Sequence, residues 1–214
     1  MTPGSANPKS SFWWEGPRSR EVLDRSFFAR SARDVAPDLL GTRLVSTVDG
    51  RRAEGVVVEV EAYLGRSDPA SHAATKSGRT PSNATMFGPA GRAYVYLSYG
   101  IHWCLNVVTG ADGDAGAVLI RAVDPVDGWD VMHDRRGRSQ DLASGPGRVG
   151  QAFGVTGVLD GHDLSTLPLR LLPGWPVAPT SVGMSPRIGI SRAKERQLRF
   201  YVMGNTSVSR TPSR

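Results

Sequence analysis

Residues 56–65 read VVVEVEAYLG, and this stretch decides the fold class because β-branched valines alternate in it with acidic and aromatic side chains. Successive side chains of a strand point to opposite faces. The valines at even positions therefore share one face, while Glu59, Glu61 and Tyr63 share the other. The segment predicts a strand with one apolar face and one face that carries two acids and a tyrosine.

Strand patterns continue on both sides of this segment. Asp49-Gly50 and the run Ser98–Ile101 are typical hairpin turns, and we expect the second hairpin to protrude. The predicted strands are 42–48, 54–63, 92–97, 102–108, 117–123 and 198–202. Helical spacing is confined to short stretches, namely two helices within 24–40 that are separated at Pro37 and one helix at 148–153; the Pro/Gly/Asp-rich stretch after 123 is expected to be loop. We predict the α+β class: a single domain with a curved, mostly antiparallel β-sheet, short helices and a protruding β-hairpin.

The two ends differ from the middle in composition. Residues 1–20 are rich in Pro, Gly and Ser and predict a mobile N-terminal arm, 21–204 form the predicted domain, and 205–214 are expected to be a frayed tail. No apolar run approaches about 18 residues, so we expect no membrane span. The N-terminus lacks the apolar core of a secretory signal, and a cytoplasmic location, on the nucleoid when DNA is bound, is expected.

The charge of the chain indicates an anionic partner. The net charge is +6, and of 26 basic residues only Lys9, Lys76 and Lys194 are lysines, so arginine predominates. Arginine binds phosphate with a planar fork and stays charged at any working pH. A preference for arginine codons is the alternative explanation. The single cysteine, Cys104, excludes an intramolecular disulfide, and the four histidines lie far apart, so no metal or other cofactor is expected.

The acidic strand face has two possible meanings. Two nearby carboxylates, or one in a dry environment, have perturbed protonation and can act as a general base. Alternatively, Glu59 and Glu61 are ordinary glutamates on a solvated face. His72 follows in a polar loop, where it is either incidental or functional.

Tyrosines cluster around the second hairpin. Tyr94 and Tyr96 share a strand face, and we expect Tyr94 to cover the sheet, as β-propensity favours. Tyr99 lies at the tip, where little sheet is available to cover. An aromatic side chain displayed there, in a basic protein, is suited to insertion into a base stack.

Together these segments give a resemblance that spans residues 30–204. The sequence resembles the 3-methyladenine (alkyladenine) DNA glycosylase family, the group that is not built on a helix-hairpin-helix. The matching words are VVVEVEAYLG, ASHA, RTPSNATMF, GRAYVYLSYGIHWCLNVV, AVLIRAVDP, GPGRVGQAFG, DL at 163–164 and PRIGI with LRFYV. The hairpin tip departs from some relatives, which place Met and Tyr where this chain has Ile101 and His102.

The resemblance implies a role for each matching position. Glu61 is similar to the general base that activates the attacking water, and Arg121 and the main-chain carbonyl of Ile190 are similar to the groups that hold that water. The remaining implied residues bind the base or the DNA: Tyr63, His72 and Tyr96 as walls around the flipped base, Asn106 as a gate against guanine, Tyr99 as the minor-groove insert, and Ile101 and Arg148 as further DNA contacts.

The implied activity is that of a monofunctional DNA glycosylase of base excision repair. It would flip alkylated or deaminated purines (3-methyladenine, 7-methylguanine, hypoxanthine, ethenoadenine) out of double-stranded DNA, as a monomer and without a cofactor. Three alternatives remain: a non-catalytic binder of damaged duplex, a bifunctional glycosylase/lyase that uses Lys76 or Lys194, and a Mg²⁺ nuclease that uses Glu59 and Glu61.

Overall fold

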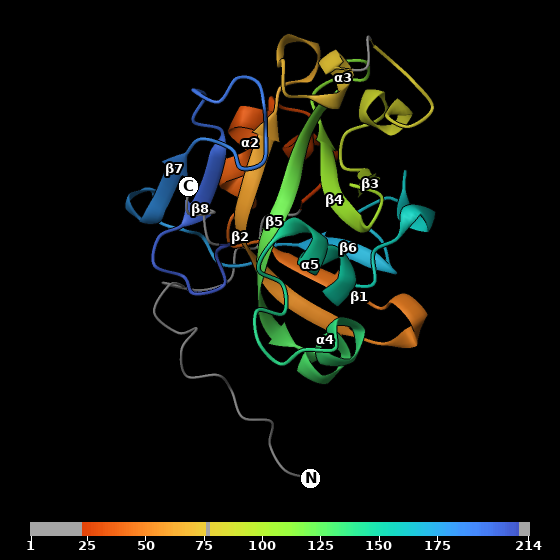
Figure 1. The fold of residues 1–214 in the computed structure, drawn as a ribbon, viewed down its shortest axis with the longest axis vertical. Helices are drawn as coiled ribbons and strands as arrows, with labels where there is room; N and C mark the ends of the chain where they lie inside the picture. The colour runs from red at the N-terminus through yellow and green to blue at the C-terminus, as the bar shows by residue number, and fades with distance from the viewer. Residues whose placement is uncertain (1–22, 76–77, 210–214) are drawn as a thin grey trace.

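A computed structural model describes residues 23–75 and 78–209 of the 214-residue chain (Figure 1). The predicted arm at 1–20, with Trp13 and Trp14, lies outside the described residues, as do 210–214. Within the described part, none of the helices has the length and apolar content needed to cross a membrane.

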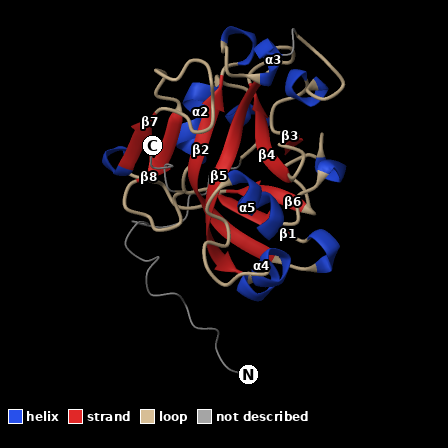
Figure 2. Cartoon of the chain, in the orientation of Figure 1, coloured by secondary structure: helices blue, strands red, loops and turns tan. Residues whose placement is uncertain are grey.

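The described residues form an α+β structure around one antiparallel sheet, which confirms the predicted class (Figure 2). The main path of the sheet runs β3-β4-β5-β2-β1-β6, and β8 joins it at β2 with β7 beyond. The strands are β1 (Arg43–Ser46), β2 (Ala53–Tyr63), β3 (Ala93–Ser98), β4 (His102–Thr109), β5 (Gly116–Asp127), β6 (Leu169–Leu172), β7 (Val182–Ser185) and β8 (Arg199–Val202).

Strand β2 is the branch point of this sheet. One edge pairs with β5 along most of its length, with a register irregularity between Val57 and Glu59. The other edge pairs with β1 at residues 53–56 and then with β8 at residues 59–61. Such a bulge increases the local bend and twist of a strand. Because β5 and β8 pair with opposite edges of β2 at residues 59–61, the acidic half of β2 lies between them.

The helices are short, as expected, but two of their details differ from the sequence prediction. They are α1 (Arg25–Phe28), α2 (Ala32–Leu39), α3 (His72–Thr75), α4 (Trp129–Arg136) and α5 (Pro146–Ala152), with 3₁₀ turns at Val48–Gly50, Gly65–Ser67, Ala84–Phe87, Gly157–Leu159 and Pro179–Ser181. The break between α1 and α2 does not fall at Pro37, which lies inside α2; the Ser31 side chain caps α2 at its start instead.

The second difference is α4, which occupies a stretch that we expected to be loop. Strand β5 extends to Asp127, and α4 then runs from Trp129 to Arg136 between Gly128 and Gly137, two flanking glycines in the left-handed conformation. Only Val131 and Met132 of α4 are buried, so the helix carries almost no apolar periodicity. The usual sequence signal for a helix is therefore missing.

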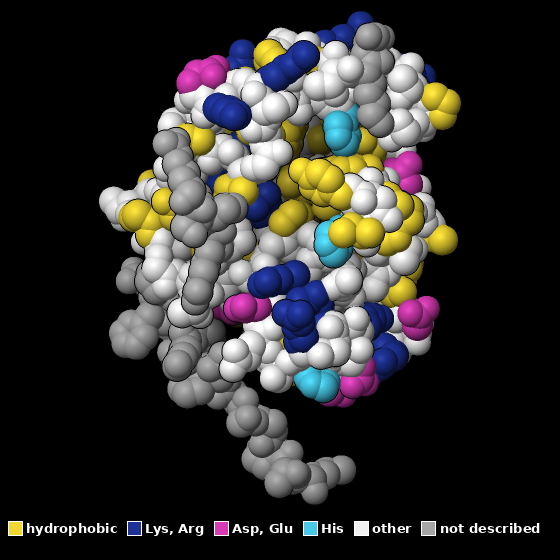
Figure 3. All heavy atoms as spheres, viewed as in Figure 1, with side chains coloured by type: hydrophobic (Ala, Val, Ile, Leu, Met, Phe, Trp, Pro, Cys, Tyr) yellow, Lys and Arg dark blue, Asp and Glu magenta, His cyan; other side chains and the backbone are white. Residues whose placement is uncertain are grey.

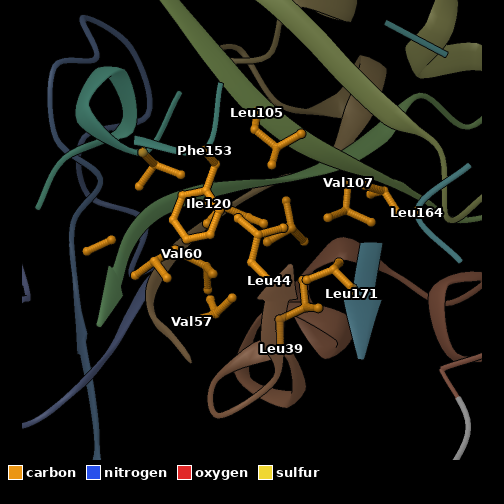
Figure 4. Packing of buried hydrophobic residues seen from close by; sticks show 14 of the residues in the cluster. Leu39, Leu44, Val57, Val60, Leu105, Val107, Ile120, Phe153, Leu164 and Leu171 are labelled. Atoms are coloured by element: carbon orange, nitrogen blue, oxygen red, sulfur yellow. The ribbon is translucent and has the colours of Figure 1, made fainter. Parts of the chain in front are cut away.

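The apolar core fills the space between the sheet and the helices (Figure 4). Leu39 of α2, Leu44 of β1, Ile120 of β5 and Phe153 after α5 meet in one cluster and are fully buried. Helix α2 packs on β2 and α5 packs on β4 and β5. This packing holds β2 and β5, the two strands that carry the predicted catalytic residues, in a rigid setting.

The described part of the expected tail, residues 205–209, is packed against the sheet rather than frayed. Asn205 Nδ2 and Ser207 Oγ donate to the Asp124 carboxylate at 3.1 and 2.8 Å. The Ser209 main-chain N–H donates to Glu59 at 2.7 Å. A polar composition was the reason to expect fraying, but here the polar groups satisfy buried carboxylates.

Candidate active site

The Glu61 carboxylate lies at the centre of the candidate site and is fully buried. Its Oε1 accepts the Ile188 main-chain N–H at 2.7 Å and lies 3.3 Å from an Arg121 guanidinium nitrogen. Its Oε2 accepts the Tyr63 hydroxyl at 2.9 Å. The solvated alternative for the acidic face is therefore wrong, since Glu59 is also fully buried.

Burial changes the chemistry of Glu61. Loss of solvation raises the pKa of its carboxyl above the usual value, and this effect outweighs Arg121, the Ile188 N–H and the Tyr63 hydroxyl, which favour the charged form. A carboxylate with a raised pKa is a stronger base when it is ionised. The arrangement is suited to taking a proton from water.

A cavity of about 920 Å³ lies beside this carboxylate. Most of the residues that the resemblance singled out line it: Tyr63, His72, Tyr96, Tyr99, Asn106, Arg121 and Ile190. Glu61 lies directly behind the lining and contacts it through Tyr63, Arg121 and Ile188. The space-filling view shows the opening as an apolar hollow with Lys or Arg side chains beside it (Figure 3).

Aromatic rings form one wall of the cavity. The His72 and Tyr96 rings meet edge-to-face with centroids 4.5 Å apart, and the Tyr94 and Tyr96 rings stack at 5.6 Å. Tyr94 is buried, lines the cavity and is hydrogen-bonded to His72 Nδ1 at 2.8 Å. The sequence predicts only that Tyr94 covers the sheet. In the structure Tyr94 also lines the cavity. Its hydrogen bond holds His72, which also lines the cavity, in a defined orientation.

The hairpin between β3 and β4 ends in an exposed apolar tip. Tyr99 is 88% exposed and Ile101 69% exposed, with Leu97 beside them at 44%. Tyr99 adopts a positive φ of 50°, an uncommon conformation for a residue other than glycine. Both the exposure and the backbone conformation favour a role for Tyr99 in contacts beyond its own chain.

Asn106 is fixed on the floor of the cavity. It is 3% exposed and lies on β4 directly opposite Tyr94 of β3. Its Nδ2 donates to the Tyr94 main-chain carbonyl at 3.0 Å. Because this bond sets the orientation of the amide, the polar surface that Asn106 presents to the cavity is defined.

Sequence comparison assigns the family to which this arrangement belongs. A sequence model described as "Methylpurine-DNA glycosylase (MPG)" matches residues 26–206. The chain belongs to this family. A protein of Rhodopseudomonas palustris (strain BisB18) is 52% identical over 88% of this chain and 90% of its own length. One from Methanoculleus marisnigri is 47% identical over 88% of this chain and 99% of its own. Both carry the words "3-methyladenine DNA glycosylase" in their names.

This member of the methylpurine-DNA glycosylase family has a buried ion pair behind the cavity wall that its sequence pattern did not indicate. Arg187 and Asp68 are fully buried, and Arg187 Nη2 donates to Asp68 at 2.8 Å. The Arg187 guanidinium also lies over the Tyr63 ring, 4.6 Å from its centroid. Asp68 in turn accepts the Leu64 N–H at 3.1 Å. The pair therefore supports Tyr63 and the segment that carries Ile188. Arg187 belongs to the PRIGI motif, but no neighbouring residue in the sequence indicated that Asp68 is its partner.

The remaining predicted DNA contact, Arg148, lies on α5 outside the cavity lining. Its side chain is 40% exposed and pairs with Asp141 at 3.5 Å. Burial, and after it the charges of Arg148 and Arg138, lowers the pKa of Arg136, and these three arginines form one basic cluster. The cluster offers positive charge on the surface of the domain, as a phosphate contact requires.

Proposed function

We propose that this chain is a monofunctional glycosylase that acts on double-stranded DNA as a monomer. It flips an alkylated or deaminated purine into the cavity and hydrolyses the bond between base and sugar with a water molecule that Glu61 activates. The observation that carries the proposal is the buried Glu61 carboxylate behind an aromatic cavity whose rim bears the exposed Tyr99.

The hydrolysis needs one base and little acid. In the proposed step Glu61 takes a proton from water, the water oxygen bonds to C1′, and the C1′–N bond breaks with its electron pair leaving on the base. Alkylation at N3 or N7 makes the base cationic, so it departs without strong protonation. The carboxylate also stabilises the developing positive charge on the sugar. Arg121 and the Ile190 carbonyl, both at the cavity, would hold the water.

The aromatic wall would hold the flipped base. Tyr63, His72 and Tyr96 line the cavity, and ring faces attract a cationic base by about 0.5–2 kcal/mol per contact. Flipping costs a few kcal/mol, and less for a damaged base. Tyr99 would offset part of this cost by filling the space that the base leaves in the duplex.

The direct test uses duplexes that carry one lesion each: 3-methyladenine, 7-methylguanine, hypoxanthine or ethenoadenine. Release of free base with an intact sugar-phosphate backbone supports the proposal. Binding without release would favour the non-catalytic binder instead.

Among the described residues, Lys194 is exposed and absent from the cavity lining. Lys76 lies outside the described residues but follows Thr75, which lines the cavity. The proposed monofunctional reaction predicts that borohydride trapping yields no covalent adduct; an adduct that Lys76→Ala abolishes would establish a lyase.

The rate of base release is expected to rise with increasing pH. This rise is the acid limb of the pH–rate profile, and its midpoint should lie above the ordinary pKa range of a glutamate. Only ionised Glu61 can accept a proton, and burial raises the pKa of this carboxyl. The base form therefore accumulates as pH increases through that raised pKa. Single-turnover rates from pH 4 to 8 on a 7-methylguanine duplex, whose alkylated base needs little protonation to leave, measure the limb. A rate independent of pH over this range would contradict the assignment of Glu61 as the base.

Replacing Tyr99 by Ser is expected to weaken capture of the flipped base. Stacking of an aromatic side chain on a base contributes about 1–3 kcal/mol, so lesion binding should fall roughly 5- to 150-fold. The folded monomer should keep its stability because the ring is 88% exposed. Met184→Ser is the matched control, since Met184 is 56% exposed and absent from the cavity lining. Equal loss of binding in both variants would refute the wedge role.

Replacing Asn106 by Ser is expected to raise the release of undamaged guanine. The buried amide, fixed by the Tyr94 carbonyl, would crowd the exocyclic amine of guanine, and a shorter side chain removes that obstacle. A steric or polar discrimination of this kind is worth about 1–3 kcal/mol, or 10- to 200-fold. Guanine release from an unmodified duplex is the measurement, with hypoxanthine release as the reference. An unchanged ratio of the two rates would show that Asn106 is not the gate.

A further inference from the structure

The second acid of β2, Glu59, lies behind the active site and is unused by the proposed reaction. It is fully buried and does not line the cavity. Its Oε1 accepts Arg121 Nε at 3.0 Å and Arg199 Nε at 2.7 Å. Ser209 donates to the same carboxylate twice, through Oγ at 2.8 Å and through its main-chain N–H at 2.7 Å. Four hydrogen bonds thus converge on one buried side chain.

One of these partners, Arg121, is shared with Glu61, the proposed general base. Its Nε is bonded to Glu59, while another guanidinium nitrogen lies 3.3 Å from Glu61. A guanidinium is planar and rigid, so a bond at Nε fixes the directions of the other nitrogens. Glu59 therefore determines how Arg121 meets Glu61 and the cavity.

The other partners tie the C-terminal segment 205–209 to the same carboxylate. Arg199 of β8 donates to the Ser209 carbonyl at 3.2 Å and to Ser185 of β7 at 2.9 Å. The beginning of the segment is anchored on Asp124 by Asn205 and Ser207. Ser209 is 8% exposed, so its bonds to Glu59 are shielded from water. The segment is held at both ends and closes the back of the site.

We propose that Glu59 is a positioning residue of the glycosylase, and that residues 205–209 work with it by fixing Arg121 against Glu61. The inference rests on the proposed function of Glu61. It makes the C-terminal segment, which the sequence suggested to be a frayed tail, a part of the catalytic apparatus.

The charges around Glu61 give this proposal a distinctive consequence. The titratable and charged groups that act on Glu61 from the elements packed around it are Glu59, Tyr63, Tyr96, Arg121 and Arg187. The negative charge of Glu59 raises the pKa of Glu61, while Arg121 lowers it. Without the Glu59 charge, Arg121 would no longer be shared between these two carboxylates. Glu61 would become a weaker base that ionises at lower pH.

The test compares wild-type protein, Glu59→Gln and Ser209→Ala on a 7-methylguanine duplex. We expect Glu59→Gln to lower the plateau rate of base release on the order of 10- to 100-fold. We also expect its acid limb to move to lower pH, while affinity for the duplex stays unchanged. Ser209→Ala should shift both quantities in the same directions by less, because the Ser209 N–H bond to Glu59 remains.

The matched control is Glu54→Gln. Glu54 is a buried glutamate of the same strand with two arginine partners, Arg43 and Arg52, and it is absent from the cavity lining. This variant should keep the wild-type acid limb. The proposal is overturned if Glu59→Gln retains the wild-type limb, or if Glu54→Gln shifts it equally. Should Glu59→Gln fail to fold, a wild-type limb in Ser209→Ala overturns it. Failure of the proposed function is a separate result, namely that wild-type protein releases no base.

Discussion

Glu61→Gln is expected to reduce base release about 100- to 10,000-fold while leaving affinity for lesion-bearing duplex unchanged. The amide has nearly the shape of the carboxylate but cannot accept the proton of the attacking water. Binding should persist because Glu61 lies behind the cavity lining, and the wall residues and Tyr99 are untouched. Single-turnover base release and equilibrium binding to the same hypoxanthine duplex measure the two effects separately.

Folding is the first control for this variant. Arg121 loses one charged partner but keeps Glu59 at 3.0 Å, so the buried cation stays paired. Glu54→Gln provides a second control for the loss of a buried glutamate from β2. General-base catalysis contributes at least about 100-fold to a rate. If Glu61→Gln releases base at more than about one-tenth of the wild-type rate, then Glu61 is not the base.

Arg187→Met is expected to destabilise the fold by about 3–5 kcal/mol, because it removes both close contacts of Arg187 with the buried Asp68 carboxylate and leaves it the more distant Arg196 guanidinium, at 3.9 Å. The substitution also removes the guanidinium from the Tyr63 ring and the donor to the Ala62 carbonyl at 2.9 Å. Urea unfolding of the full chain measures the loss as a lower midpoint. Because Tyr63 and Ile188 both donate to Glu61, base release should also fall under folding conditions.

Two comparisons separate the buried pair from ordinary surface electrostatics. Arg25→Met breaks the ion pair between Arg25 and Asp112, in which the two side chains are 62% and 60% exposed. This substitution should lower the free energy of unfolding by at most about 1 kcal/mol. The double variant Asp68→Asn/Arg187→Met should lose less stability than the two single variants summed, since neither charge is then left alone. Strict additivity, or equal losses for Arg25→Met and Arg187→Met, would show that pairing is not the source of the stability.

The local pattern of the chain was sufficient for several conclusions that the structure confirms. Alternation placed Glu59, Glu61 and Tyr63 on one face of β2, and these side chains share contacts there. Turn residues identified the hairpin whose tip exposes Tyr99. Element boundaries were less accurate where the apolar signal is weak, as in α4, and at the break between α1 and α2, which lies before the Ser31 N-cap and not at Pro37.

The sequence by itself determined the α+β class, the acidic strand and the tyrosine tip, because a strand period of two and a glycine turn are properties of neighbouring residues. Only the tertiary structure decided that both glutamates are buried and what surrounds them. The partners of Glu59 lie 62, 140 and 150 positions away in sequence, at Arg121, Arg199 and Ser209. Periodicity reports which side of a strand a residue occupies. It carries no information on which distant segment packs against that side, and that packing sets the solvation and the pKa of Glu61.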